Sequence, residues 1–272
     1  MRGNMMLEPL NGETRLFPIV GDPIKYVKSP ERLTRGFAAR GRNAICVPMQ
    51  VAEGALAAAM EGFNAIPNID GLLITMPHKF AAFDYCATSS GTSKLFGVVS
   101  VMRRNADDTW HGDMLDGLAF VKAQKDQGAQ PDGAKVLLLG AGGAGSAIAV
   151  ALLDAGVREL IVYDINQDRA NTLVELLNER GDRRIRVGPA DPVGCNMVCN
   201  ATSMGMADDD PLPVNPVLFK SSMFIGDVIA GHGETALLKV ARDAGCGTAN
   251  GDQMVEAIQE IMLDFMLASR TV

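Results

Sequence analysis

The segment KVLLLGAGGAGSAIAVALLDAG, residues 135–156, decides the fold class. Its apolar run 136–139 predicts a buried strand, and glycines follow the run directly. The apolar residues beyond them predict a helix from Ala144 to Ala155. The stretch 136–153 has 18 residues without charge, but the clustered glycines favour a strand–turn–helix unit over a membrane span.

The glycine spacing predicts a dinucleotide site. Gly140, Gly142 and Gly145 satisfy G-x-G-x-x-G, which combines a tight turn, close backbone approach to a pyrophosphate and a free helix N-terminus. Asp164 ends the next predicted strand, ELIVYD, 19 positions after Gly145. The alternative is a glycine turn kept for packing alone. The cofactor-binding residues expected in this unit are Gly140, Ala141, Gly142, Gly143, Ala144, Gly145 and Asp164.

Asp164 also bears on the choice of cofactor. A carboxylate at this place accepts hydrogen bonds from the adenosine ribose hydroxyls of NAD and repels the additional phosphate of NADP. Arg169 is near enough to pair with that phosphate, or it is a solvated helix residue. We therefore expect NAD as the preferred cofactor, with NADP possible.

Apolar runs alternate with helical stretches along most of the chain, which is typical of parallel α/β sheets. The first part predicts strands at 15–20, 43–49 and 71–75, helices at 29–40 and 52–63, and a hairpin at 98–104 and 109–113. A helix from 117 leads to the polar linker 125–134. Beyond the glycine segment we expect strands at 159–164, 196–202 and 224–229, and helices at 234–245 and 251–269.

Composition excludes several classes of partner. The chain has 272 residues, 47% of them hydrophobic, which suffices for two domains with cores of their own. Its net charge of −7 argues against nucleic acid and against anionic membrane surfaces. No basic and then apolar N-terminal segment is present, so we expect a cytoplasmic protein.

The cysteines and histidines do not predict a metal site. Five scattered cysteines fit reduced thiols. His78, His111 and His232 have no zinc-type spacing. We expect buried thiols and no bound metal.

Six segments occur in one order along the chain: GDPIKYVKSPE (21–31), ITMPHK (74–79), GDMLDG (112–117), GAGGAGSA (140–147), NATSMGM (200–206) and GDQMVEAI (251–258). Through them the sequence resembles the shikimate dehydrogenase family over nearly its whole length. The resemblance implies an α/β protein of two domains. A substrate-binding and catalytic domain comprises 1–116, completed by the C-terminal helix 251–272, and a Rossmann NAD(P)-binding domain, 117–250, is inserted into it.

The resemblance also implies a catalytic pair, Lys79 and Asp116. Lys79 would take the proton of a substrate hydroxyl while hydride passes to the nicotinamide, and Asp116 would orient the lysine. Elementary chemistry agrees, because oxidation of a secondary alcohol needs a proton acceptor beside the departing hydride. The alternative is a solvated surface lysine.

Further cofactor-side residues are implied in the loop after a predicted strand, with two more near the nicotinamide. They are Asn200, Thr202, Ser203, Met204, Gly205, Val228 and Gly251. For the loop residues the alternative is an ordinary strand-to-turn exit.

The substrate pocket departs from the family pattern. Its implied substrate-binding residues are Ser29, Thr75, Ser100 and Gln259, of which Ser29 before Pro30 is equally typical of a helix N-cap. Polar family positions are occupied here by Val27, Leu73, Met114, Leu115, Ala230 and Ile258, and an asparagine is replaced by Ser100. Lys25, Lys28 and His232 are possible compensating contacts or ordinary loop residues. Each lost hydrogen bond costs roughly 1 kcal/mol, so several would weaken shikimate binding by orders of magnitude.

The resulting hypothesis is an NAD(P)-dependent oxidoreductase that reversibly oxidises a ring secondary alcohol on a shikimate- or quinate-like cyclic hydroxy acid. One alternative is a true shikimate dehydrogenase of aromatic amino acid biosynthesis. Another is a nucleotide-binding regulatory protein without turnover. We expect a monomer or a homodimer.

Overall fold

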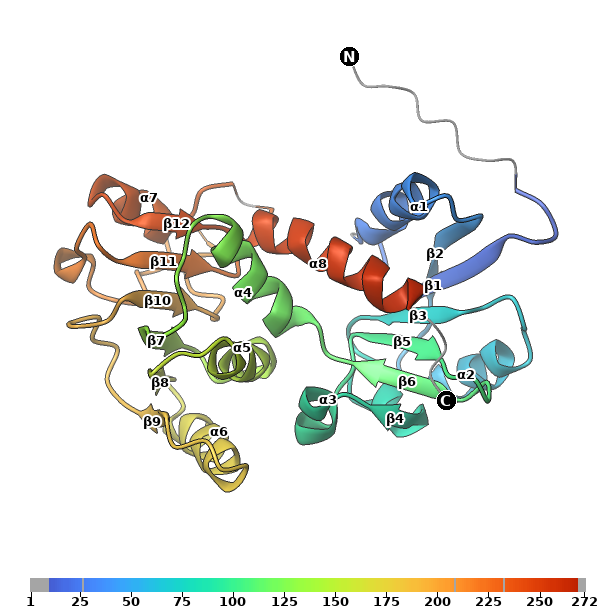
Figure 1. The fold of residues 1–272 in the computed structure, drawn as a ribbon, viewed down its shortest axis with the longest axis horizontal. Coiled ribbons are helices and arrows are strands. Elements are labelled where there is room, and N and C mark those ends of the chain that lie inside the picture. Colours follow the sequence, from blue (N-terminus) through green and yellow to red (C-terminus); the bar gives the residue numbers. More distant parts are fainter. Residues whose placement is uncertain (1–9, 26, 208, 232, 269–272) are drawn as a thin grey trace, which may run out of the picture. The chain divides into compact units, whose positions relative to one another are not determined.

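The computed structural model describes residues 10–25, 27–207, 209–231 and 233–268 (Figure 1). The chain forms two compact units, Met1–Leu115 with Gln259–Val272, and Asp116–Ile258. The expected boundaries differ from this division at two places. Asp116 belongs to the second unit because it begins a helix there, and the second unit also takes the start of the last helix.

The first unit is built on a six-stranded sheet in the order β2-β1-β3-β5-β6-β4. Its strands are β1 (Arg15–Gly21), β2 (Ala44–Gln50), β3 (Gly71–Ile74), β4 (Cys86–Ser89), β5 (Val101–Arg104) and β6 (Trp110–Asp113). Strands β2, β1 and β3 are parallel, and β5 and β6 form the predicted antiparallel hairpin. Its other elements are α1 (Ser29–Ala39), α2 (Leu56–Asn64), the 3₁₀-helix η1 (Ala81–Tyr85), α3 (Gly91–Phe96) and part of α8 (Gly251–Leu267).

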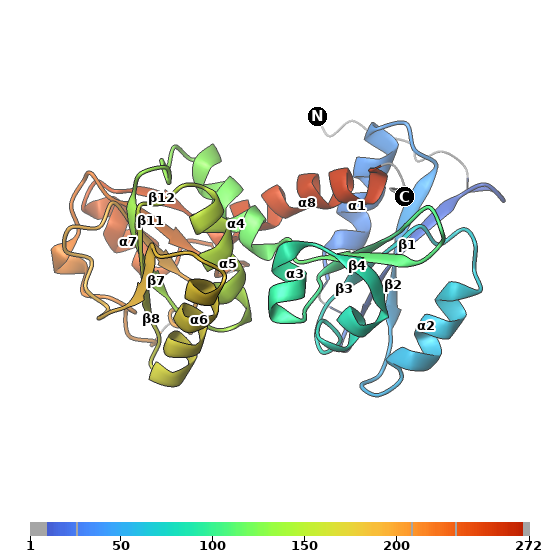
Figure 2. The ribbon, with the colours of Figure 1, turned by 60° about the horizontal axis from the view of Figure 1, so that its bottom comes forward.

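Both faces of this sheet are covered, as Figure 2 shows for α1 and α2. Val20 belongs to the core cluster that includes Met60 and Phe63 of α2. On the other face, the ring of Phe17 stacks on that of Phe37 in α1, with 4.5 Å between the ring centroids. Alternate residues of a strand point to opposite faces, so the almost continuous apolar run of β1 follows from burial on two sides.

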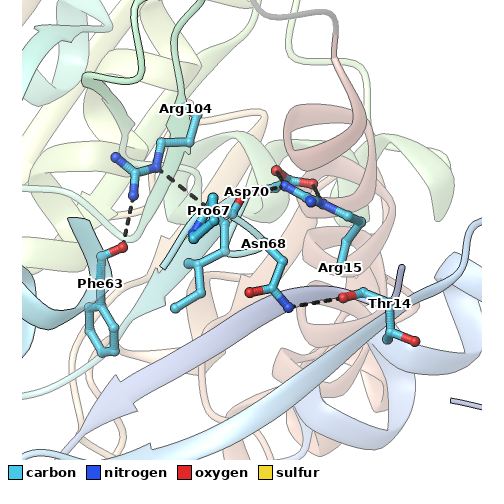
Figure 3. Close-up of polar contacts among 8 residues, drawn as sticks. Thr14, Arg15, Phe63, Pro67, Asn68, Asp70 and Arg104 are labelled. Atoms are coloured by element: carbon cyan, nitrogen blue, oxygen red, sulfur yellow. Dashed lines mark hydrogen bonds and ion pairs between the residues drawn. The ribbon is translucent and has the colours of Figure 1, made fainter. Parts of the chain in front are cut away.

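Polar contacts hold the amino end of β1 to the loop between α2 and β3 (Figure 3). Arg15 Nε donates to Asp70 Oδ2 at 2.8 Å, and a second guanidinium nitrogen donates to the Pro67 carbonyl at 2.7 Å. Arg104 donates to the Phe63 carbonyl at 2.9 Å, and its guanidinium lies 3.9 Å from the centroid of the Trp110 ring. The contacts of these two arginines therefore lie at the end of the sheet opposite the carboxyl ends of β1, β2 and β3.

The second unit has a six-stranded, all-parallel sheet in the order β12-β11-β10-β7-β8-β9. The strands are β7 (Lys135–Leu139), β8 (Glu159–Tyr163), β9 (Ile185–Val187), β10 (Met197–Asn200), β11 (Phe224–Asp227) and β12 (Gly247–Ala249). The helices are α4 (Asp116–Asp126), α5 (Gly143–Asp154), α6 (Gln167–Glu179), the 3₁₀-helix η2 (Pro216–Leu218) and α7 (Ala236–Asp243). Counted from β7, the order is the 3-2-1-4-5-6 order of a Rossmann fold, and it reverses between β7 and β10. The α/β prediction and the Rossmann prediction are confirmed.

Small residues let two helices of this unit approach closely. A Cβ on Gly117 of α4 would lie 2.1 Å from the Ala147 carbonyl oxygen of α5. On α7, Leu237 and Leu238 belong to the core cluster that contains Leu137 and Ile225 of the sheet. Helix α4 therefore packs closely against α5, and α7 packs on the sheet.

The sequence patterns do not predict β4, β9 or β12, which have three or four residues each. Within the described part of the chain, no helix combines the length and apolar character that crossing a bilayer requires.

Candidate active site

The glycine loop joins β7 to α5 in the second unit. Gly140 has a φ of +99°, a left-handed conformation that favours glycine. A Cβ on Gly145 would lie 2.0 Å from the Gly140 carbonyl oxygen, so the first turn of the helix touches the end of the strand. A Cβ on Gly142 or Gly143 would meet nothing within 4 Å. The loop therefore has a tight turn at Gly140, a packed side at Gly145 and an open side at Gly142 and Gly143.

The start of α5 fits a pyrophosphate. Its N-cap, Gly142, has no side-chain cap hydrogen bond, so the backbone N–H groups of the first turn are not capped by a side chain. A cavity of about 670 Å³ lies beside the loop. Its lining comes from the ends of β7, β8 and β10 and from the segment 210–213, and it includes Gly140, Gly142, Asp164, Ile165, Arg169, Thr202, Ser203, Met204 and Asp210. These residues fit a dinucleotide.

Asp164 ties the glycine loop to the start of α6. Its side chain is buried, and Oδ2 accepts a hydrogen bond from the Ala141 N–H at 2.7 Å. Oδ1 accepts from the N–H of Asn166, the N-cap of α6, at 2.8 Å. Each carboxylate oxygen has a further lone pair, so Asp164 retains the capacity to accept from ribose hydroxyls. Arg169 lines the same cavity, as the sequence suggested, but Asp210 adds a second carboxylate to its wall.

The side chain of Asn200 forms hydrogen bonds that hold the loop after β10. This side chain is fully buried, and its Oδ1 accepts hydrogen bonds from the Thr202 hydroxyl at 2.6 Å and the Thr202 N–H at 3.2 Å. Its Nδ2 donates to the Met204 carbonyl at 3.2 Å, and the Thr202 hydroxyl accepts from the Met204 N–H at 3.1 Å. Asn200 is therefore a support of the loop, whereas Thr202, Ser203 and Met204 line the cavity.

Three residues that the sequence reasoning missed complete this loop. Asp227 and Thr235 are buried beneath it. Asp210 accepts hydrogen bonds through Oδ2 from the Gly205 and Ala207 N–H groups at 3.0 and 3.1 Å, and these bonds lower the pKa of the Asp210 carboxyl group. An aspartate ending the strand FIGD, in register with Asn200, was the available signal.

Gly251 and Val228 lie together near the end of β11. A Cβ on Gly251 would lie 2.3 Å from the carbonyl carbon of Ile229 and 2.4 Å from the Val228 oxygen, so glycine is required by this contact. Asn250 and Gln253 then cap α8 reciprocally, through backbone-to-side-chain bonds of 2.8 and 2.9 Å.

In the first unit, the loop that carries Thr75 and Lys79 contacts the carboxyl ends of β1, β2 and β3. The Thr75 N–H donates to the Val20 carbonyl at 2.9 Å, and the Asp22 N–H donates to the Met76 carbonyl at 2.9 Å. His78 is buried, and its Nε2 lies 2.7 Å from the Val51 carbonyl oxygen. The loop that carries Lys79 is thus fixed against all three strand ends.

Lys79 and Asp116 are both half-buried. The Lys79 carbonyl accepts a hydrogen bond from the Val99 N–H at 3.0 Å, which fixes its backbone. Asp116 is the first residue of α4 and of the second unit. Their pairing stays a prediction.

The predicted substrate-binding residues have different surroundings. Ser100 is buried, and its hydroxyl accepts from the Leu115 N–H at 3.0 Å, so this hydroxyl serves the backbone. Thr75 and Gln259 are half-buried. The alternative that Ser29 is the N-cap of α1 is wrong: α1 begins at Ser29, the N-cap position is Lys28, and no side chain caps the helix. The Ser29 hydroxyl therefore does not serve as a cap.

The apolar replacements are part of the core. Leu73, Met114 and Leu115 are buried, with 4% or less of each exposed. Val27 and Ala230 are half-buried, and His232 lies outside the described residues. Three of these apolar side chains therefore pack in the core, and two are partly exposed.

The cysteines are free thiols, and four of the five are buried. Burial raises the pKa of the Cys46 and Cys199 thiols to about 12. Among the residues that the structure describes, no group of three or more His, Cys, Asp or Glu side chains is arranged to hold a metal ion.

The chain is similar to known proteins over most of its length. Residues 19–102 match the family model of the shikimate dehydrogenase substrate binding domain. The chain is 33% identical over 257 residues to the shikimate dehydrogenase (NADP(+)) of Rubrobacter xylanophilus. The aligned region covers 92% of this chain and 90% of that protein.

Two solved structures share the whole architecture. One is the ligand-free 5-ketofructose reductase of Gluconobacter sp. strain CHM43, with a TM-score of 0.87, 26% identity and 95% of each chain covered. The other is the Listeria monocytogenes shikimate 5-dehydrogenase in complex with shikimate and NAD, with a TM-score of 0.89, 25% identity, and 98% of this chain and 96% of that chain covered. This chain belongs to the shikimate dehydrogenase family, a family of two-domain α/β oxidoreductases that act on a CH–OH group.

Proposed function

We propose that this protein oxidises a ring secondary alcohol of a cyclic hydroxy acid with fewer polar groups than shikimate, reversibly and with NAD as the preferred cofactor. The observation that carries the proposal is the combination of an intact dinucleotide cradle with the burial of Leu73, Met114 and Leu115 in the core. A pocket without these polar groups leaves additional substrate hydroxyls unpaired, at roughly 1–3 kcal/mol each.

The proposed chemistry divides between cofactor and chain. The bound nicotinamide supplies the hydride acceptor. Lys79 Nζ takes the hydroxyl proton as the C–H electron pair leaves the alcohol carbon as hydride, which yields the ketone. Asp116 orients the lysine. Thr75, Gln259 and the uncapped N-terminus of α1 with Ser29 support substrate binding, since a helix N-terminus stabilises an anion such as a carboxylate.

The preference for NAD rests on the charges at the cavity wall. Two carboxylates, those of Asp164 and Asp210, and one guanidinium, that of Arg169, line the cavity. A 2′-phosphate carries about two negative charges and is disfavoured beside two carboxylates. The free thiols favour a reducing compartment, and we propose the cytoplasm.

The test is nicotinamide reduction by the purified protein with NAD or NADP, against shikimate, quinate and cyclic hydroxy acids with fewer hydroxyl groups. We expect a higher kcat/KM with NAD and with a less hydroxylated acid. Fast turnover of shikimate would replace this proposal with a true shikimate dehydrogenase. Binding of NAD without turnover of any acid would favour the regulatory alternative.

The catalytic assignment has its own test. Lys79→Ala should lower kcat by about 10²–10⁴-fold, the usual contribution of general acid–base catalysis, and leave NAD affinity unchanged. Lys94→Ala, at an exposed lysine of α3, is the matched control and should change neither quantity. A Lys79→Ala variant that keeps a tenth or more of the wild-type kcat would refute the assignment.

A further inference from the structure

We infer that Asp227 is a positioning residue for the cofactor-side loop 201–206, because its buried carboxylate holds the Asn200 amide that hydrogen-bonds this loop. The inference rests on the proposed function, since it concerns how the dinucleotide site is shaped. Asp227 ends β11, and Asn200 is its register partner at the end of β10.

Asp227 is surrounded by donors. Only 1% of its surface is exposed. Oδ1 accepts hydrogen bonds from Asn200 Nδ2 at 3.1 Å and from the Ile229 N–H at 3.2 Å, and Oδ2 accepts from the Thr235 hydroxyl at 2.7 Å. Burial raises the pKa of the Asp227 carboxyl group, and these hydrogen bonds oppose that shift. Three donors that converge on two oxygens match an ionised carboxylate.

The Asp227 carboxylate holds the NH₂ group of the Asn200 amide. An ionised aspartate only accepts hydrogen bonds, so the NH₂ group of Asn200 must face it. The amide oxygen then faces the loop, where it accepts from the N–H and the hydroxyl of Thr202. If the amide were reversed, its NH₂ group would oppose the Thr202 N–H, and its oxygen would oppose Asp227. Asp227, the Thr202 N–H and the Met204 carbonyl therefore all favour the same orientation of the Asn200 amide.

The amide orientation passes into the loop through two further bonds. Thr202, held by Asn200, accepts from the Met204 N–H at 3.1 Å, and Asn200 Nδ2 donates to the Met204 carbonyl at 3.2 Å. These bonds hold Thr202, Ser203 and Met204 at the wall of the cavity. Thr235 supports the carboxylate from the other side and is also the N-cap of α7.

Asp227→Asn tests the inference, because it keeps the shape of the side chain and removes the requirement for an acceptor. An asparagine carries no charge and can present an NH₂ group to Asn200 Nδ2, so the charge-assisted hydrogen bond that holds the Asn200 amide is lost or weakened. The readout is the Kd for NAD and for NADP by calorimetry, which needs no substrate. We expect the Kd of the preferred dinucleotide to rise about tenfold, with kcat at saturating cofactor within about threefold of wild type.

The matched control is Thr34→Val in the first unit. Thr34 is buried, and its hydroxyl accepts from the Cys46 N–H at 3.0 Å, so the variant also loses one buried hydrogen bond. It should lower the melting temperature and leave the dinucleotide Kd unchanged. If Asp227→Asn does not fold, Thr235→Val replaces it, because it removes the donor that holds Asp227 Oδ2 and should also raise the dinucleotide Kd. Thr235→Ser keeps that donor and should have the wild-type Kd.

A Kd that rises threefold or more in Asp227→Asn, without a rise in Thr34→Val, supports the positioning role. A Kd within threefold of wild type overturns it, whatever the melting temperature. Wild-type protein that binds a dinucleotide but turns over no substrate refutes the proposed function alone, and the Kd comparison still decides this inference. Wild-type protein that binds neither dinucleotide overturns both.

Discussion

Gly145→Ala separates the packing role of the glycine loop from its ligand-binding role. The added Cβ would lie 2.0 Å from the carbonyl oxygen of Gly140 and 2.8 Å from its carbonyl carbon. The obstacle is backbone, and Gly140 is itself anchored by its N–H, which donates to the Tyr163 carbonyl at 2.7 Å. The end of β7 and the start of α5 must therefore move apart by about 1 Å, because a Cβ closer than 3.0 Å to a backbone atom is not tolerated.

Overpacking of this kind costs about 3 kcal/mol, the upper part of the usual range. A unit of this size loses about 2–4 °C of melting temperature per kcal/mol, so we expect a decrease of about 6–12 °C. The assay is thermal unfolding by circular dichroism without cofactor. A melting temperature within about 2 °C of wild type would refute the packing reasoning.

Gly142→Ala is the matched variant in the same loop. Gly142 has φ −75° and ψ −170°, which alanine adopts, and its Cβ meets nothing within 4 Å. Its stability should change by no more than about 1 kcal/mol. The methyl group would occupy the open side of the loop, so NAD affinity measured by calorimetry should fall about tenfold. Unchanged affinity would contradict the assignment of this side to the pyrophosphate.

Two further predictions concern stability. Because burial raises the pKa of the Cys199 thiol to about 12, the native state retains its proton when the unfolded chain loses it above a pKa of about 8.5. The stabilisation is complete below that value and declines as pH rises. We therefore expect the difference in unfolding free energy between wild type and Cys199→Ala, measured by urea unfolding, to shrink by about 2 kcal/mol between pH 7 and pH 10. An unchanged difference would contradict the buried-thiol assignment. Asp70→Asn should cost about 1 kcal/mol in low salt and less in 1 M salt, because the Arg15–Asp70 pair is only partly buried; the same loss at both salt concentrations would exclude the ion pair as its cause.

Local patterns of the sequence determined much of this protein. A strand, a glycine turn and a helix within 135–156 predict the Rossmann unit, because each element depends on neighbours a few residues away. The hairpin of β5 and β6 is encoded in the same local way, by the turn residues 105–108 directly after the largely apolar run 98–102. The ordered motifs, among them ITMPHK with Lys79 and GAGGAGSA with Gly142, likewise point to the family before the fold is known.

Only the tertiary structure decided which polar groups face a ligand and which support the fold. Asn200 and Ser100 are site candidates by motif, yet their side chains bond loop and backbone groups. Asp227, 27 residues beyond Asn200, becomes its partner because β10 and β11 are parallel and in register. The physical reason is that a side chain's partners are set by strand register and burial, which join residues distant in the chain, whereas sequence periodicity records only contacts along one element.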